Sequence, residues 1–278
     1  MVINGGAECS PTFFILVMPL DTACIFVDGE NLRHSLVDLF HNEFNRHDYL
    51  PRNADWSGFF NHLVKQSGAK VLLRAYWYVV DEIDFFPSGN WHKDSEIRNR
   101  VLCKHEPFSN ELRMLSEPSK TIKSREMANS VLTEQRRMFG KFEGWKRIQN
   151  AIAATTDLVE FRRAGLIRYD LFKQRLHNEK AVDVYLATDL LQLRDIYDIA
   201  IIVSGDQDYV PAVQAIKNSG KHVVNVSFKE RRGELLPGGA RRLNQKTDKI
   251  VEMEYADVLK FMRLGTRPAG NQAKLFNK

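Results

Sequence analysis

Two aspartates follow directly after a short apolar run in the second half of the chain. Residues 199–203 read Ile-Ala-Ile-Ile-Val, which predicts a buried strand, and Ser204 and Gly205 end the run. Asp206 and Asp208 therefore come just past the carboxyl end of this strand, which is where ligands bind in open parallel sheets. A structural interpretation is also open, in which Asp208 caps the next helix and Asp206 occupies an ordinary turn.

Another aspartate ends the first clear apolar run of the chain. Residues 23–27 read Ala-Cys-Ile-Phe-Val, a run typical of a strand that is buried on both faces, and Asp28 follows it. Gly29 allows the backbone to turn sharply, and Asn31 is suited to cap the helix expected next. An ordinary turn from strand to helix would explain the same residues, so a function for Asp28 depends on what lies beside it.

A fourth aspartate lies near the start of a predicted helix. Apolar residues nearly encircle the helix expected over residues 180–191, so we expect this helix to be largely buried. Asp183 falls on a face that should be packed. A buried anion costs on the order of several kcal/mol unless it is paired or binds a cation. Lys180 is the structural alternative as a partner, and Asp189, on another side of the helix, is interpreted as structural.

These four aspartates can converge at one edge of a parallel sheet, because three follow strands and one begins a helix. Carboxylates that lie so close cannot all stay ionised without a cation, and oxygen ligands select a hard ion such as Mg²⁺ or Mn²⁺. Such an ion can lower the pKa of a water molecule and neutralise charge on a scissile phosphate. The sequence contains no Gly-rich phosphate loop, Ser/His/Asp grouping or HExxH run that would indicate a different chemistry.

The elements that must position the aspartates indicate an α/β fold. An amphipathic helical pattern over residues 56–64 lies between the first strand and a long strand predicted over residues 71–80. Strand, helix and strand in this order imply parallel pairing. Further strands are expected over residues 166–169 and 222–228. A chain of 278 residues can bury such a core without disulfides.

Residues 81–150 are expected to form a helical and basic insertion. The helical patterns break near Pro107 and Pro118, and between residues 91 and 149 the excess of basic over acidic residues equals the whole net charge of +5. Solvated helix faces explain most such charges, whereas basic side chains interleaved with aromatic ones also suit single-stranded nucleic acid. The candidates for nucleic-acid binding in this segment are Arg98, Arg100, Lys123, Arg125, Arg136 and Arg137.

A second basic segment spans residues 229–249. Glycine and proline make part of it a predicted loop beside the end of the strand over residues 222–228. A basic loop at that place is suited to a second phosphate contact. Its candidates are Arg231, Arg232, Arg241 and Arg242.

Three motifs together resemble the NYN family of PIN-like nucleases, in its LabA-like (DUF88) branch. They are Val-Asp28-Gly-Glu-Asn31, Lys180-Ala-Val-Asp183-Val with Thr188-Asp189-Leu-Leu behind it, and Ser204-Gly-Asp206-Gln-Asp208-Tyr-Val-Pro. The resemblance covers about residues 22–80 and 155–255. It implies a three-layer α/β/α PIN-like fold with a central, mainly parallel sheet.

The same resemblance implies roles for named residues. Asp28, Asp183, Asp206 and Asp208 would be the catalytic and metal-binding residues, with Asn31 and Ser204 in supporting positions. It further implies cleavage of RNA that depends on Mg²⁺ or Mn²⁺. We therefore expect a metal-dependent endoribonuclease with RNA as its partner. DNA is not excluded as a substrate, and a homodimer is possible.

Two other functions stay open from the sequence. One is a catalytically silent module that binds RNA or regulates a partner through its basic insertion. The other is a phosphatase-like or receiver-like site built on Asp28, which would need a suitably placed lysine and a different order of motifs.

The remaining expectations concern boundaries and location. We expect an N-terminal extension over residues 1–20, a PIN-like domain over 21–265 that carries the insertion at about 81–150, and a flexible tail over 266–278. The N-terminal apolar run lacks the features of a signal peptide or a membrane-spanning helix. Three cysteines without metal-ligand spacing favour a reducing, cytoplasmic location.

Overall fold

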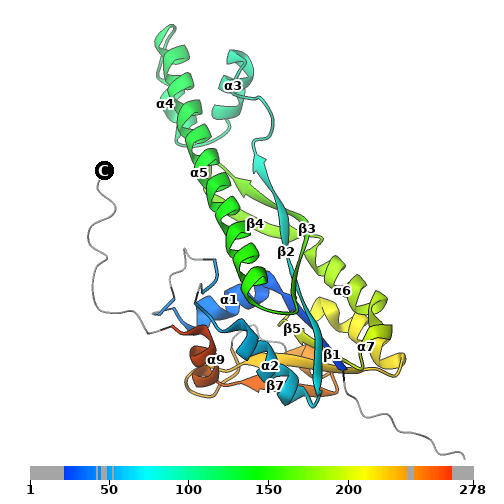
Figure 1. Ribbon diagram of the computed structural model, residues 1–278. Helices are drawn as coiled ribbons and strands as arrows, with labels where there is room; N and C mark the ends of the chain where they lie inside the picture. The colour runs from blue at the N-terminus through cyan, green and yellow to red at the C-terminus, as the bar shows by residue number, and fades with distance from the viewer. Residues whose placement is uncertain (1–21, 42, 45–48, 52, 237–240, 265–278) are drawn as a thin grey trace, which may run out of the picture.

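A computed structural model describes residues 22–41, 43–44, 49–51, 53–236 and 241–264 (Figure 1). The expected N-terminal extension and C-terminal tail lie outside the described residues. The fold is mixed α/β, as the strand and helix patterns predict, with a mostly parallel sheet flanked by helices. No helix within the described ranges is long and apolar enough to cross a membrane.

One seven-stranded sheet organises the molecule, in the order β4-β3-β2-β1-β5-β6-β7. Its strands are β1 (Thr22–Asp28), β2 (Val71–Phe86), β3 (Val159–Asp170), β4 (Arg175–Lys180), β5 (Ile199–Val203), β6 (His222–Phe228) and β7 (Lys249–Met253). Every neighbouring pair is parallel except β3 and β4. Strands β1 and β5 are central and almost wholly apolar, and Val27 pairs with Val203, so both strands end at the same edge of the sheet.

Helices cover both faces of the sheet and make three layers. The helices are α1 (Gly29–Leu39), α2 (Trp56–Ser67), α6 (Val182–Gln192), α7 (Val210–Asn218), α8 (Arg241–Asn244) and α9 (Tyr255–Met262). Successive strand residues point to opposite faces. On β2, Trp77 packs against Trp56 of α2 with ring centroids 4.8 Å apart, whereas the Tyr78 hydroxyl donates to Asp189 of α6 at 2.8 Å. Helices α2 and α6 therefore lie on opposite faces, and the structural role expected for Asp189 is confirmed.

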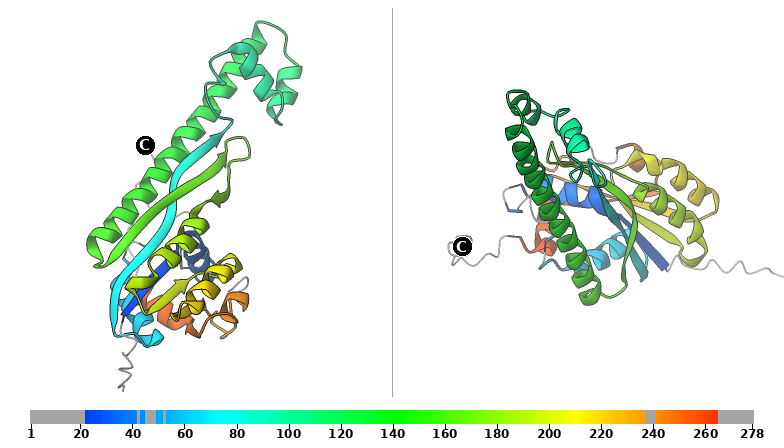
Figure 2. Two further views of the ribbon diagram at one scale, coloured as in Figure 1. Left: turned by 90° about the vertical axis from the view of Figure 1, so that its right-hand side faces the viewer. Right: turned by 90° about the horizontal axis from the view of Figure 1, so that it is seen from above.

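The basic segment forms an arm that projects from the body of the molecule. It contains α3 (Ser95–Leu102), α4 (Phe108–Arg113) and the long α5 (Ser119–Thr155), which packs along β2 and β3. Figure 2 shows α3 and α4 at the far end of this arm. Pro107 and Pro118 directly precede α4 and α5, which confirms the predicted breaks.

Several elements differ from the sequence predictions. Strand β2 continues to Phe86, six residues past the predicted end, because it pairs with β3 along its whole outer half. Strands β4 and β7 and helix α9 were not predicted. Helix α6 is less buried than its composition suggests, since the side chains of Val184 and Tyr185 are 66% and 54% exposed.

Gly165 of β3 allows the close approach of Lys180, the last residue of β4 before α6 begins. Its φ is +64°, and a Cβ atom there would lie 1.8 Å from the carbonyl oxygen of Lys180. We expect Gly165→Ala to lower the free energy of unfolding by roughly 2 to 4 kcal/mol, because both backbone strain and a clash with backbone result. Urea unfolding would measure this loss. Gly220→Ala is the matched control, since its φ is +81° with no atom within 4 Å, and it should cost only about 1 kcal/mol. Equal losses in the two variants would contradict the role of this contact.

Candidate active site

The first functional side chain is placed by the junction of β1 and α1. Asp28 ends β1, and its Oδ1 accepts the N–H of Asn31 at 3.0 Å, so Asp28 itself caps α1. The prediction that Asn31 is the cap is wrong. Its Oδ1 instead accepts the N–H of Gly205 at 2.9 Å and so ties α1 to the segment after β5. Gly29 permits this junction, because a Cβ there would lie 2.5 Å from the carbonyl oxygen of Tyr78.

Ser204 connects the two strand ends through its hydroxyl. The Oγ donates to Asp28 Oδ2 at 2.9 Å and accepts the N–H of Asp206 at 3.0 Å. Both Ser204 and Asp28 are buried. The supporting position that the family resemblance implies for Ser204 is therefore a direct contact with a candidate metal ligand.

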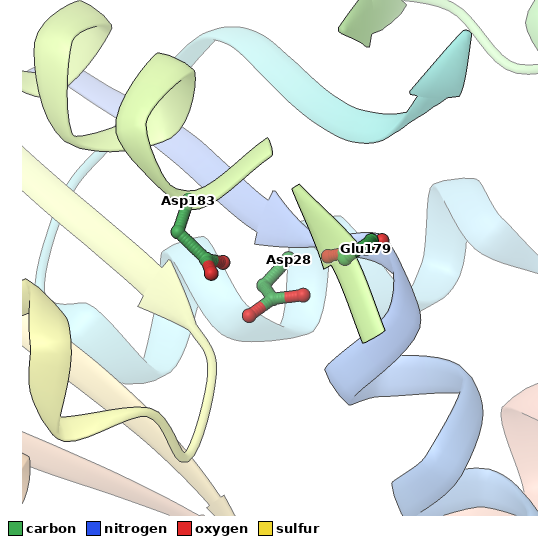
Figure 3. A group of neighbouring side chains, drawn as sticks. All are labelled: Asp28, Glu179 and Asp183. Carbon is green, nitrogen blue, oxygen red and sulfur yellow. The ribbon is translucent and has the colours of Figure 1, made fainter. Parts of the chain in front are cut away.

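Three carboxylates from separate elements meet beyond the end of β1. Asp28 of β1, Glu179 of β4 and Asp183 of α6 each offer an oxygen, and these oxygens lie within 4.8 Å of one another. Figure 3 shows the three side chains converging from a strand end, an edge strand and the first turn of a helix. Glu179 was not among the predicted site residues, because β4 reads Arg-Leu-His-Asn-Glu-Lys and has no apolar run to indicate a strand.

Tyr209 contacts two of these carboxylates through its hydroxyl. Its buried hydroxyl donates to Asp183 Oδ1 at 2.8 Å and lies 3.3 Å from Asp28 Oδ2. Burial and the two aspartates raise the pKa of Tyr209 far above its ordinary value, so the phenol stays protonated. A phenol has a single proton to donate, so Tyr209 cannot compensate both carboxylates. The partner of Asp183 is thus Tyr209, where Lys180 was the structural alternative.

The pKa values of Asp28 and Glu179 indicate that the three carboxylates lack a neighbouring positive charge. Burial raises the pKa of Asp28 to about 6, opposed by the Asn31 N–H and reinforced by Asp183. Burial also raises the pKa of Glu179 to about 8, reinforced by Asp28 and Glu30. The Oε2 of Glu179 is buried and has no hydrogen-bond partner among the residues that the structure describes. Oxygen-only ligands with an unsatisfied buried oxygen fit a hard divalent cation.

Asp206 and Asp208 lie beside this group and are not members of it. The Oδ1 of Asp206 accepts the N–H of Asp208 at 2.9 Å and caps the 3₁₀ turn η2 (Gln207–Tyr209). The structural alternative, in which Asp208 caps the next helix, is wrong, because Asp206 caps η2 and α7 begins after Tyr209 with no side-chain cap. Of the four aspartates expected to converge, the structure brings Asp28 and Asp183 together and adds Glu179.

The basic candidates divide into buried, paired and exposed side chains. Arg98 is only 4% exposed and donates to Ser124 Oγ and the His92 carbonyl, both at 3.1 Å, which corrects its expected role in nucleic-acid binding to one of holding α3 on α5. Paired with acidic side chains are Arg100, Lys123, Arg137 and Arg231. Exposed and without an ion pair in the described part of the chain are Arg125, Arg136, Arg232, Arg241 and Arg242.

A family model for the NYN domain matches residues 125–237. The chain carries an NYN domain. This finding confirms the resemblance to the PIN-like nuclease family, although it does not distinguish the LabA-like branch. The matched segment begins within α5, extends beyond β6 and contains Glu179 and Asp183. Asp28 lies outside the matched segment and reaches the NYN residues through the pairing of β1 with β5.

Two solved structures are similar to the NYN chain at low identity. One is a protein of unknown function from Vibrio parahaemolyticus, with 15% identity, a TM-score of 0.40 and coverage of 84% of this chain and 94% of that one. The other is the T5 D15 protein co-crystallized with metal ions, with 12% identity, a TM-score of 0.32 and coverage of 81% of this chain and 59% of that one. These TM-scores are too low to support an argument. No curated protein matches the chain in sequence.

Proposed function

We propose that this NYN protein is a metal-dependent endoribonuclease whose Asp28, Glu179 and Asp183 hold a Mg²⁺ or Mn²⁺ ion. The observation that carries the proposal is the meeting of these three carboxylates, together with the buried Oε2 of Glu179, which no described residue partners. An RNA phosphate cannot approach such a group closely while it is ionised and unneutralised, because like charges repel. A divalent cation removes this obstacle and makes an acidic site compatible with a polyanionic substrate.

The chain's own residues set the geometry of the proposed centre. Ser204 holds one oxygen of Asp28 and the Asn31 N–H holds the other, so this carboxylate has a fixed orientation. Tyr209 orients Asp183 by donating to Oδ1. Preorganised ligands of this kind lower the cost of assembling a centre at the moment of reaction.

When bound, a divalent ion would supply Lewis-acid chemistry, lowering the pKa of an attacking water and neutralising charge on the scissile phosphate. Hydrolysis by this route needs no ribose 2′-hydroxyl, so we expect products with a 5′-phosphate and a 3′-hydroxyl. For the same reason the cleavage chemistry alone does not select RNA over DNA.

Incubation of the purified chain with end-labelled single-stranded RNA, duplex RNA and single-stranded DNA tests the proposal. We expect cleavage of RNA with Mg²⁺ or Mn²⁺ and none with EDTA. RNA binding that persists in EDTA, with no product under any divalent ion, would contradict the nuclease and favour the catalytically silent module. Cleavage that proceeds equally in EDTA would contradict the metal.

A further inference from the structure

A cavity of about 600 Å³ lies beside η2, the turn that also carries Tyr209. Gln207 and Asp208 of η2 line one wall, and Arg242 of α8 and Lys246 after it line the other. This size is within the range of small-molecule and nucleotide sites. The residues Gln207 to Tyr209 form one turn, so the cavity and the three carboxylates flank the same short segment.

One wall of the cavity carries two cations, Arg242 and Lys246, and neither forms an ion pair within the described residues. Arg242 donates one N–H to Gln207 Oε1 at 3.1 Å, which leaves most of its donors available. The ammonium of Lys246 has no partner among the residues that the structure describes. Its backbone is nevertheless fixed, because Lys217 Nζ donates to the Lys246 carbonyl at 2.8 Å and pairs with Asp248 at 2.9 Å. Two such cations on a fixed backbone suit a phosphate group.

Asp208, on the wall formed by η2, requires a hydrogen-bond donor from the ligand. Asp208 is exposed, its carboxylate has no partner within the described ranges, and an ionised carboxylate only accepts. A free phosphate or an acidic peptide would leave it opposed by like charge. Val210 and Pro211 add an apolar surface between the two walls, on which the face of a base can lie. A ligand that carries a phosphate, a hydroxyl donor and an apolar face matches all three parts.

We propose that this cavity is a subsite for a ribonucleotide next to the scissile phosphate, with Arg242 and Lys246 on its phosphate and Asp208 accepting its 2′-hydroxyl. The inference rests on the proposed nuclease function and adds a basis for choosing RNA, since the 2′-hydroxyl is the group that distinguishes RNA from DNA. It also gives a role to Asp208, whose carboxylate lies outside the metal-ligand group.

Binding of fluorescein-labelled single-stranded RNA to the full chain in EDTA tests the cationic wall. We expect Arg242→Gln and Lys246→Gln each to weaken binding roughly tenfold and to lower the slope of affinity against salt by about one. Arg241→Gln is the matched control, because it removes the same charge from the same helix but does not line the cavity. Equal losses for Arg241→Gln and Arg242→Gln would overturn the subsite.

The ratio of RNA to DNA affinity tests the wall formed by η2. With labelled RNA and DNA of the same sequence, we expect wild type to prefer RNA and Asp208→Ala to bring the ratio close to one. A purely electrostatic role would raise both affinities by the same factor and leave the ratio unchanged, which would overturn the inference. Because binding is measured in EDTA, a failed subsite is distinguishable from a failed nuclease, which would show no cleavage whatever the ratio.

Discussion

Asp28→Asn is expected to lower the rate of metal-dependent RNA cleavage at least a hundredfold. Removing only a hydrogen-bond partner of a metal ligand typically lowers activity about 10- to 100-fold, and Asp28 is itself a proposed ligand. Asp28 is the central ligand of the proposed site, since it contacts both Ser204 and Tyr209 and lies within reach of Glu179 and Asp183. An amide in its place removes the negative charge that attracts the ion. The measurement is the cleavage rate of end-labelled RNA over a range of Mn²⁺ concentrations.

The fold should survive this substitution. Asparagine is as good a helix N-cap as aspartate, so the bond from the Asn31 N–H can persist. Loss of a buried charge beside two other carboxylates should leave the metal-free protein at least as resistant to heat as wild type. Retained cleavage in a folded variant would contradict the assignment of Asp28, and a lower melting temperature without metal would contradict the repulsion argued for this group.

Stability of the metal-free protein is expected to fall as pH rises, and added Mn²⁺ should reverse the trend. Asp28 and Glu179 have folded pKa values of about 6 and about 8, against ordinary values of 3.8 and 4.5. The folded state therefore binds these protons more tightly than the unfolded state. The stabilisation is fully present below the ordinary pKa values and is lost as pH rises to about 8, at a rate on the order of 1 kcal/mol per pH unit per group.

Urea unfolding across this pH interval, with EDTA or with Mn²⁺, measures the effect. A bound cation takes the place of the protons, so the stabilisation by Mn²⁺ should grow as pH rises. Glu179→Gln is the control, because it removes the group with the higher pKa and should flatten the metal-free profile above pH about 6. A wild-type profile that is flat from pH about 5 to about 8 would contradict the lack of a neighbouring positive charge at these carboxylates.

The central part of the fold could be predicted because its signals are local. The apolar runs at residues 23–27, 199–203 and 222–228 form β1, β5 and β6, since strands buried on both faces have no polar alternation to obscure them. The outer half of β2 contains Asp81, Glu82 and Asp84 and reads as a loop. It is a strand because β3 and α5 extend with it beyond the body, a tertiary cause that no local pattern reports.

Two of the three carboxylates of the candidate site could be predicted from the sequence, because their elements have local signals. Asp28 ends a recognisable strand and Asp183 lies in the first turn of a recognisable helix, and the topology brings these two positions to one edge of the sheet. Glu179 lies on a short polar strand whose place is set by pairing with β3 and by the close contact at Gly165. Asp206 and Asp208 follow β5 as predicted, but Asp206 caps the turn η2 by accepting the N–H of Asp208, and neither carboxylate joins the group of three. Side-chain direction within a single turn was not readable from spacing.

Anomalous diffraction from crystals grown with Mn²⁺ would show whether Asp28, Glu179 and Asp183 hold a divalent ion. We predict one anomalous peak in contact with carboxylate oxygens of all three residues, and its loss in crystals of Glu179→Gln. A peak bound by Asp206 and Asp208 without Glu179, or the absence of any peak from this edge of the sheet at saturating Mn²⁺, would contradict a metal centre built on these three residues.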